Sequence, residues 1–282
     1  MSFSFLPIAS SSSGNSTIIM AGSSMVLVDI GITYKLLNSV LLNNRIDIKN
    51  ISALLITHAH YDHIKGLRVF LNKTNDIKVY TREKTKNILI KNDPGLSLHL
   101  DRFIEIKESS FNINELNIKW CKLSHQGWGE RDNTGEHIGF VFNYHGQQLS
   151  YMTDLGEMDE RIIDLHRSSD IFFIEANYDK NLQLNSGRPW GLIQRVIGKY
   201  GHLSNEQTAE YLYELVDVQK TKHIFLAHIS KECNCRELAV KTIKEKLKAK
   251  QGLDLERIKI EHETEKVYPC LTKTLESCII KL

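Results

Sequence analysis

The stretch that decides the fold is Ile51-Ser52-Ala53-Leu54-Leu55-Ile56-Thr57-His58-Ala59-His60-Tyr61-Asp62-His63. Its first six residues have the apolar character of a buried strand, and its last six carry three histidines and an aspartate. Imidazoles and a carboxylate crowded together would be poorly satisfied unless a cation lay among them. The stretch therefore predicts a divalent metal site at the end of a strand.

Composition is that of an ordinary globular chain. Of its 282 residues, 41% are hydrophobic and 25% are charged, which is enough to bury a large core. The formal net charge of +2 does not by itself predict a nucleic-acid binder. No run approaches the roughly 18 apolar residues of a membrane span, and residues 1–7 lack the basic start of a signal peptide. We therefore expect a cytoplasmic protein.

Hydrophobic periodicity predicts an α/β protein. The expected strands are 3–9, 16–20, 25–29, 51–56, 78–80, 102–106, 116–123, 138–143, 148–153, 171–174, 223–227 and 258–261. The expected helices are 36–41, 67–71, 192–200, 205–216 and 236–248. Two halves, each of strands followed by helices, predict two packed sheets covered by helices on their outer faces. We expect one domain over residues 1–265 and a C-terminal extension of unassigned structure over residues 266–282.

Three further ligand-type residues each follow an apolar strand: His125, Asp154 and His228. The first cluster cannot complete two metal sites alone, so a two-metal centre needs such additional donors. A lone histidine is more often structural than a ligand, and Asp154 could simply begin a turn. Their position after buried strands, in the company of the first cluster, favours the ligand interpretation.

This set resembles the metallo-β-lactamase superfamily, whose motifs match Asp29, His58-x-His60-x-Asp62-His63, His125, Asp154 and His228. The resemblance implies an αββα four-layer sandwich that binds two divalent ions. It implies one ion held by His58, His60 and His125, and another held by Asp62, His63 and His228. Asp154 would bridge both ions, and Asp29 would brace the ligand loop without binding metal. A His/Asp set suits zinc or manganese, with iron as a further option.

Four further segments resemble one subgroup of this superfamily, the single-domain YycJ/WalJ-type proteins regarded as DNA exonucleases. The matching segments are Ser11-Ser12-Ser13-Gly14-Asn15-Ser16, Glu175-Ala176-Asn177-Tyr178-Asp179, Gly201-His202-Leu203-Ser204-Asn205 and His228-Ile229-Ser230-Lys231-Glu232. Two positions depart from the subgroup pattern. Tyr178 stands where a histidine is expected, and Cys233-Asn234-Cys235 stands where an Asn-Asn pair is expected.

These segments supply the remaining candidate residues. We assign catalytic roles to Asp62 and His202, and possible substrate contacts to Ser13, Asn15, Asn177, Ser204 and Asn205. Ser204 can be read as a helix N-cap with Gln207 as its capping-box partner, or as the start of a phosphate-binding helix end. The serine-rich loop can be a simple turn or a polar loop facing the metals.

Several functions use such a centre. The leading hypothesis is a metal-dependent phosphodiesterase, specifically a DNA exonuclease, with a nucleic-acid substrate and no membrane partner. An RNA-processing nuclease and a thioester or lactone hydrolase remain alternatives, because the metal set does not choose the electrophile. A non-catalytic scaffold is less favoured, because the ligand set is complete. Five dispersed cysteines (Cys121, Cys233, Cys235, Cys270 and Cys278) suit a reducing compartment, and the Cys233-x-Cys235 pair alone offers too few donors for a zinc site.

Overall fold

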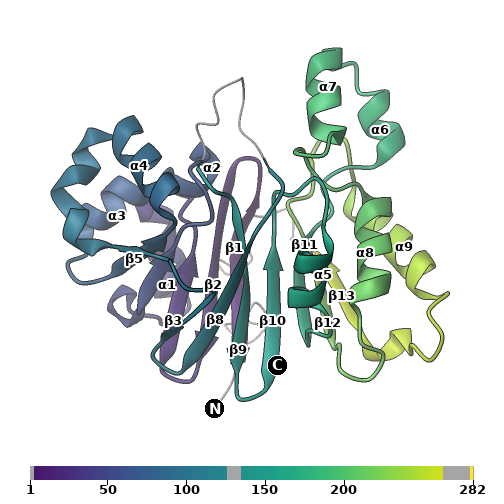
Figure 1. Cartoon of the computed structure of the whole chain (residues 1–282), viewed down its shortest axis with the longest axis horizontal. Coiled ribbons are helices and arrows are strands. Elements are labelled where there is room, and N and C mark those ends of the chain that lie inside the picture. Colours follow the sequence, from purple (N-terminus) through teal and green to yellow (C-terminus); the bar gives the residue numbers. More distant parts are fainter. Residues whose placement is uncertain (1–2, 126–134, 263–279, 282) are drawn as a thin grey trace. The chain divides into compact units, whose positions relative to one another are not determined.

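Figure 1 shows the computed structural model of the chain, which describes residues 3–125, 135–262 and 280–281. The chain divides into two compact units. The first comprises Met1–Ile118, Gly127–Ile138 and Thr264–Leu282, and the second comprises Lys119–Gln126 and Gly139–Glu263. Each unit carries part of the predicted ligand set.

The first sheet has the strand order β14-β1-β2-β3-β4-β5-β6. Its strands are β1 (Phe3–Ser11), β2 (Gly14–Ala21), β3 (Ser24–Val28), β4 (Ala53–Leu55), β5 (Lys78–Thr81), β6 (Phe103–Glu105) and β14 (Ile280–Lys281). Strands β1 to β3 form an antiparallel meander, and β3 to β6 are parallel. Parallel neighbours need crossover connections. These contain α1 (Tyr34–Asn43), η1 (Ile48–Asn50), α2 (Tyr61–Ile64), α3 (Leu67–Lys73), α4 (Glu83–Asn92) and η2 (Pro94–Arg102).

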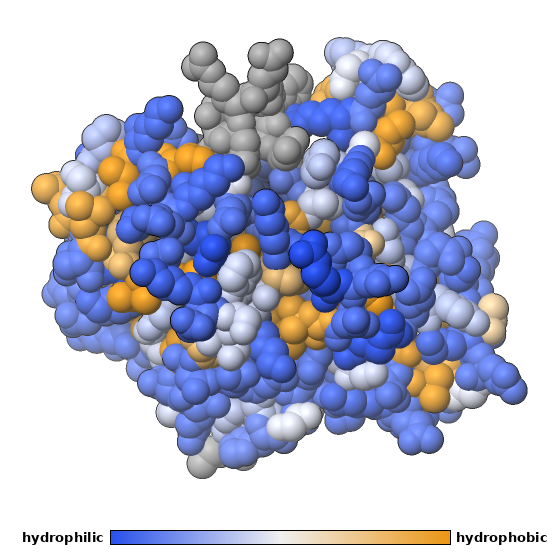
Figure 2. All heavy atoms as spheres, viewed as in Figure 1, coloured by the Kyte–Doolittle hydropathy of each residue, from blue (hydrophilic) through white to orange (hydrophobic). Residues whose placement is uncertain are grey.

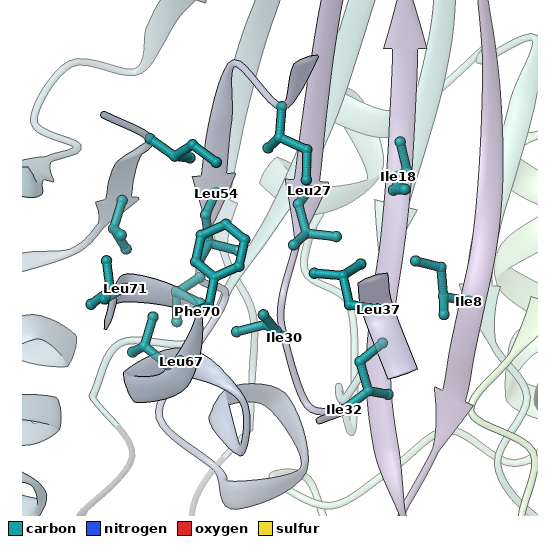
Figure 3. Packing of buried hydrophobic residues seen from close by; sticks show 14 of the residues in the cluster. Ile8, Ile18, Leu27, Ile30, Ile32, Leu37, Leu54, Leu67, Phe70 and Leu71 are labelled. Atoms are coloured by element: carbon teal, nitrogen blue, oxygen red, sulfur yellow. The ribbon is translucent and has the colours of Figure 1, made fainter. Parts of the chain in front are cut away.

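The core of the first unit lies where α1 and α3 cover one face of this sheet (Figure 3). Leu37 from α1 and Phe70 from α3 are fully buried, as are Leu27 and Leu54 from the central strands. Full burial of such a side chain stabilises the fold by about 1.5–3 kcal/mol. This packing fixes β4, and with it the start of the histidine-rich loop.

The second sheet has the strand order β13-β12-β11-β10-β9-β8-β7. Its strands are β7 (Ser110–Ile113), β8 (Leu116–Lys122), β9 (Ile138–Tyr144), β10 (Gln147–Met152), β11 (Ile171–Glu175), β12 (His223–Ala227) and β13 (Lys259–His262). Because β10, β11 and β12 are parallel, their C-terminal ends share one edge of the sheet. The helical segments here are α5 (Glu160–His166), α6 (Lys180–Leu184), α7 (Trp190–Ile197), α8 (Asn205–Leu215), α9 (Arg236–Leu247) and η3 (Leu255–Arg257).

The predicted α/β class with two mixed sheets is confirmed, and the predicted strands appear with small shifts at their ends. Helices α2, α4, α5 and α6 and strands β7 and β14 were not predicted. Helix α4 buries only Thr85 and Leu89, so it lacks a strong apolar period. Within the proposed extension, Ile280 and Lys281 pair with β1, while residues 263–279 and 282 lie outside the described part of the chain, Cys270 and Cys278 among them. None of the helices in the described ranges is long and apolar enough to cross a membrane.

Candidate metal centre

The first ligand group lies on the loop that follows β4 and continues into α2. His58 and His63 are fully buried, and the side chain of Asp62 is 25% exposed. His58 Nε2 lies 2.7 Å from His60 Nδ1, and His63 Nε2 lies 3.7 Å from Asp62 Oδ2. The predicted ligands of this loop are therefore brought together within the first unit.

Asp29 lies beneath this loop at the end of β3. Its carboxylate accepts hydrogen bonds from Thr57 N and Thr57 Oγ1, both at 2.8 Å, and contacts His63 Nδ1 at 2.7 Å. Burial raises the pKa of the Asp29 carboxyl, while His63 and Thr57 oppose that rise. Asp29 also adopts a left-handed backbone with φ of 57°, a strained conformation for a residue other than glycine. The fold holds this carboxylate against the ligand loop at a local energetic cost.

Two more side chains lie against the first group. Asn15, a predicted substrate contact, donates from Nδ2 to Asp62 Oδ2 at 3.1 Å and to His63 Nε2 at 2.9 Å. His137 was not predicted, yet its buried ring lies 3.9 Å from that of His58. No nearby residue in the sequence marked His137, since its neighbour His58 lies almost eighty positions away.

The second ligand group lies at the shared edge of β10, β11 and β12. Ligand atoms of Asp154, Glu175, His202 and His228 all lie within 4.8 Å of one another. His228 Nδ1 is 2.8 Å from Glu175 Oε1 and 3.4 Å from Asp154 Oδ1. Asp154 and His228 have positive φ values of 58° and 53°. Like Asp29, these strand-end residues turn sharply where the side chain enters the cluster.

Glu175 is the main residue that sequence reasoning missed. Its buried carboxylate lies 2.7 Å from His202 Nδ1, and it accepts a hydrogen bond from Leu155 N at 2.9 Å. Burial alone raises the pKa of this carboxyl, but the charges and hydrogen bonds of His202 and His228 outweigh burial and hold the pKa below its usual value. The signal in the sequence was a single acid that ends the apolar strand Ile171–Glu175.

His125 lies in the same unit, where Nδ1 contacts the Gly201 carbonyl oxygen at 2.8 Å. Burial, together with the nearby His202, lowers the pKa of His125 to about 4. The imidazole is therefore neutral near pH 7, which is the form that binds a metal.

The hydrogen bonds assign one tautomer to four of the predicted ligand histidines. Nδ1 faces an oxygen acceptor in each: Asp29 for His63, Gly201 O for His125, Glu175 for His228, and Thr57 Oγ1 for His58. Thr57 Oγ1 already donates to Asp29, so it accepts from His58. Each Nδ1 then carries the proton and each Nε2 keeps its lone pair, as in histidines oriented for metal binding. The donor set fits divalent metal ions.

The other predicted substrate contacts occupy varied settings. Ser13 is exposed on the β1–β2 turn, and the Asn177 side chain donates to the His228 carbonyl at 2.8 Å. Ser204 forms the predicted capping box with Gln207 at the start of α8. Asn205 is fully buried and exchanges hydrogen bonds with the Asn234 side chain, and its backbone N–H donates to Tyr178 O. The N–H of Gln207 donates to the Ser204 hydroxyl and the N–H of Asn205 donates to Tyr178 O, so both already have partners at this helix start. This arrangement matches the helix-initiation interpretation of Ser204.

The cysteine pair does not join either group. Cys233 is buried and Cys235 is exposed. Among residues 3–125, 135–262 and 280–281, no metal-type cluster includes a cysteine. Asn234, which lies between the two cysteines, donates a hydrogen bond to the Asn205 side chain.

Comparison with known proteins identifies the family. Residues 25–229 match the model of the β-lactamase superfamily domain. The chain is 30% identical to "Exodeoxyribonuclease YycJ" of Bacillus anthracis, over 89% of this chain and 91% of that protein. It is also 30% identical to "Exodeoxyribonuclease WalJ" of Streptococcus pneumoniae, over 86% of this chain and 87% of that one. The chain therefore belongs to the β-lactamase superfamily and, within it, to the YycJ/WalJ-type group.

A solved structure confirms the predicted fold. The Zn(2+)-bound PqqB of Methylobacterium extorquens superposes with a TM-score of 0.70 at 12% identity, covering 92% of this chain and 98% of that chain. The metallo-beta-lactamase fold protein YhfI of Bacillus subtilis superposes with a TM-score of 0.65 at 11% identity, covering 94% of this chain and 97% of that chain. At these identities the two likenesses show the fold and leave the substrate open.

Proposed function

We propose that this protein is a metal-dependent phosphodiesterase that degrades DNA from an end. The observation that carries the proposal is the likeness, over about nine tenths of both chains, to a protein named as an exodeoxyribonuclease. The ligand residues support it, because all the superfamily positions carry metal-binding side chains. A DNA substrate also supports a cytoplasmic location.

Seven residues would hold the two divalent ions: His58, His60, Asp62, His63, His125, Asp154 and His228. Zinc and manganese suit these nitrogen and oxygen donors, and iron is a further option. When bound, such a pair of ions lowers the pKa of water and offsets the negative charge of a phosphodiester.

The protein's own residues then handle protons and orientation. Asp62 keeps part of its carboxylate exposed, so it can orient the attacking water and accept its proton. His202 has Nδ1 held by Glu175, so its imidazolium form carries a second proton on Nε2 that it can give to the leaving oxygen. Asn15 and Asn177 hold ligand residues by hydrogen bonds, and Ser13 remains a candidate contact for the substrate.

A substrate panel tests this proposal. Metal-loaded protein is incubated with end-labelled single-stranded DNA, double-stranded DNA, a matched RNA strand and a thioester. DNA should be shortened stepwise from one end. If the protein binds metal but leaves every DNA end intact, the proposal is refuted. Faster cleavage of RNA than of DNA would indicate an RNA-processing nuclease instead. Hydrolysis of the thioester alone would indicate a thioester hydrolase.

A further inference from the structure

Helices α6 and α7 form an excursion, residues 180–200, that begins and ends at the second ligand group. Its two ends are joined by hydrogen bonds from Asn177 N to Leu203 O and from Asn205 N to Tyr178 O, both at 2.9 Å. The contact between His202 Nδ1 and Glu175 Oε1, at 2.7 Å, joins the same two segments. The α6–α7 hairpin is therefore anchored next to the proposed catalytic residue His202.

The hairpin has an unusual charge. Residues 180–200 contain four basic side chains and no acidic one, while the whole chain has 36 basic and 34 acidic residues. The four are Lys180, Arg188, Arg195 and Lys199. Arg188 pairs with Glu232, and Lys199 pairs with Glu157, at 2.7 and 2.6 Å. The partners Glu232 and Glu157 are themselves solvent-exposed, so these pairs are weak and a phosphate can replace the acid.

The hairpin also presents apolar side chains to solvent. Trp190 is 59% exposed and Tyr200 is 47% exposed, and Leu182 and Leu184 of α6 are also exposed. Helix α7 buries only Ile193. Figure 2 shows hydrophobic residues gathered over α6 and α7. These aromatic rings contribute little to the fold, so their exposure points to a ligand.

One ligand class matches both properties. Proteins that bind single-stranded nucleic acid combine a basic surface with aromatic rings on which bases stack. A double helix keeps its base faces inside the stack, so it offers the aromatic rings nothing to stack on. An apolar protein partner would match the leucines but would not explain the excess of basic side chains in this segment.

We propose that the α6–α7 hairpin binds a single-stranded segment of the DNA substrate. Trp190 and Tyr200 stack on bases, and Lys180 and Arg195 contact phosphates. This inference rests on the proposed nuclease function and adds the form of substrate that the site receives.

Fluorescence anisotropy with a labelled, cleavage-resistant phosphorothioate oligothymidine tests the hairpin, using the full-length metal-loaded protein. Trp190→Ala is expected to weaken single-strand binding about tenfold, because stacking on one aromatic ring is lost. Lys180→Ala is expected to make the slope of log affinity against log salt concentration shallower by about 0.7, the contribution of one phosphate contact on a single strand. The matched controls are Leu98→Ala, an 81% exposed residue of η2, and Lys241→Ala on α9, and both should bind as the unaltered protein does.

Two results would overturn the inference. One is unchanged single-strand affinity in Trp190→Ala and Tyr200→Ala. The other is a change of oligomeric state by light scattering in these variants without a change of DNA affinity, which would make the hairpin a protein interface. Hydrolysis of thymidine 5′-p-nitrophenyl phosphate by the unaltered protein tests the nuclease function separately, so that a failure of the hairpin is distinguishable from a failure of the function.

Discussion

At the residue scale, the second ligand group depends on Glu175, which orients His202 and His228 together. Glu175→Gln keeps the shape but removes the negative charge beside both Nδ1–H groups, and its NH₂ donor faces either these groups at the Oε1 position or Leu155 N–H at the Oε2 position. We expect metal affinity to fall about 10- to 100-fold, as for other residues that orient metal ligands. Calorimetric titration with zinc or manganese measures it.

The control for Glu175 is Glu206→Gln, an exposed acid in the first turn of α8. It should leave metal binding unchanged. If Glu175→Gln binds metal as tightly as the unaltered protein, Glu175 has no orienting role.

His166 provides a pH dependence away from the ligand groups. It is buried between Ser150 Oγ, at 2.6 Å from Nδ1, and Cys121 Sγ, at 3.4 Å from Nε2. Burial lowers the pKa of His166 to about 3. In the unfolded chain the pKa is about 6.5, so below that pH only the unfolded state takes up this proton. Stability is therefore lost as pH falls from about 6.5 towards 3.

Urea unfolding of the unaltered protein and His166→Gln measures this effect. Between pH 7.5 and 5.0 the unaltered protein should lose about 2 kcal/mol more than the variant, from this one group. The exposed His145→Asn variant serves as control and should follow the unaltered protein. Equal losses in all three proteins would show that His166 is not held neutral by the fold.

The sequence predicted candidate metal ligands that lie together in the chain or follow clear strands, and it missed the side chains that only the fold brings next to them. The loop from His58 to His63 is visible because its four side chains are neighbours in the chain. Glu175 and His137 have no such neighbours, because their partners lie on other strands and loops. Pairwise contacts of this kind depend on strand register, which local patterns do not specify.

At the element scale, the ligand loop depends on close packing against the end of β3. A Cβ atom on Gly31 would lie 1.5 Å from Asp62 O and 2.6 Å from Asn15 N, both of them backbone atoms. Gly31→Ala should therefore displace α2, destabilise the fold by about 1–3 kcal/mol and weaken metal binding. Thermal unfolding and metal titration measure the two effects.

Gly191→Ala is the matched control, because its Cβ would have no atom within 4 Å. It lies in α7, where alanine should stabilise the helix by about 0.5–1 kcal/mol. If Gly31→Ala has the same unfolding temperature and the same metal affinity as Gly191→Ala, close packing at Gly31 does not constrain the ligand loop.

Elements with a strong apolar period were predictable, and the weak ones were not. Strand β12 matches its predicted range, because all its five residues are buried. Helix α5 buries only Ile162 and His166, and helix α6 buries only Gln183, so neither shows an apolar stripe at helical spacing. Strand β14 has two residues and is defined by its pairing with β1, a contact between opposite ends of the chain.

At the scale of the whole molecule, the chain combines two units that each hold ligand residues in a fixed hydrogen-bonded frame. Superfamily membership was predictable, because the motif is long and its order along the chain is specific. The choice of substrate was less predictable, because superfamily membership does not determine which electrophile the site attacks.

The most direct test of the central claim is a metal titration followed by DNA degradation. Chelator-treated protein is given increasing zinc or manganese, and the release of nucleotides from labelled single-stranded DNA is measured together with the metal content. The account predicts no release without metal, activity that rises up to two ions per chain, and no recovery in Asp154→Ala. Full-rate DNA degradation by protein that elemental analysis shows to be metal-free would contradict it.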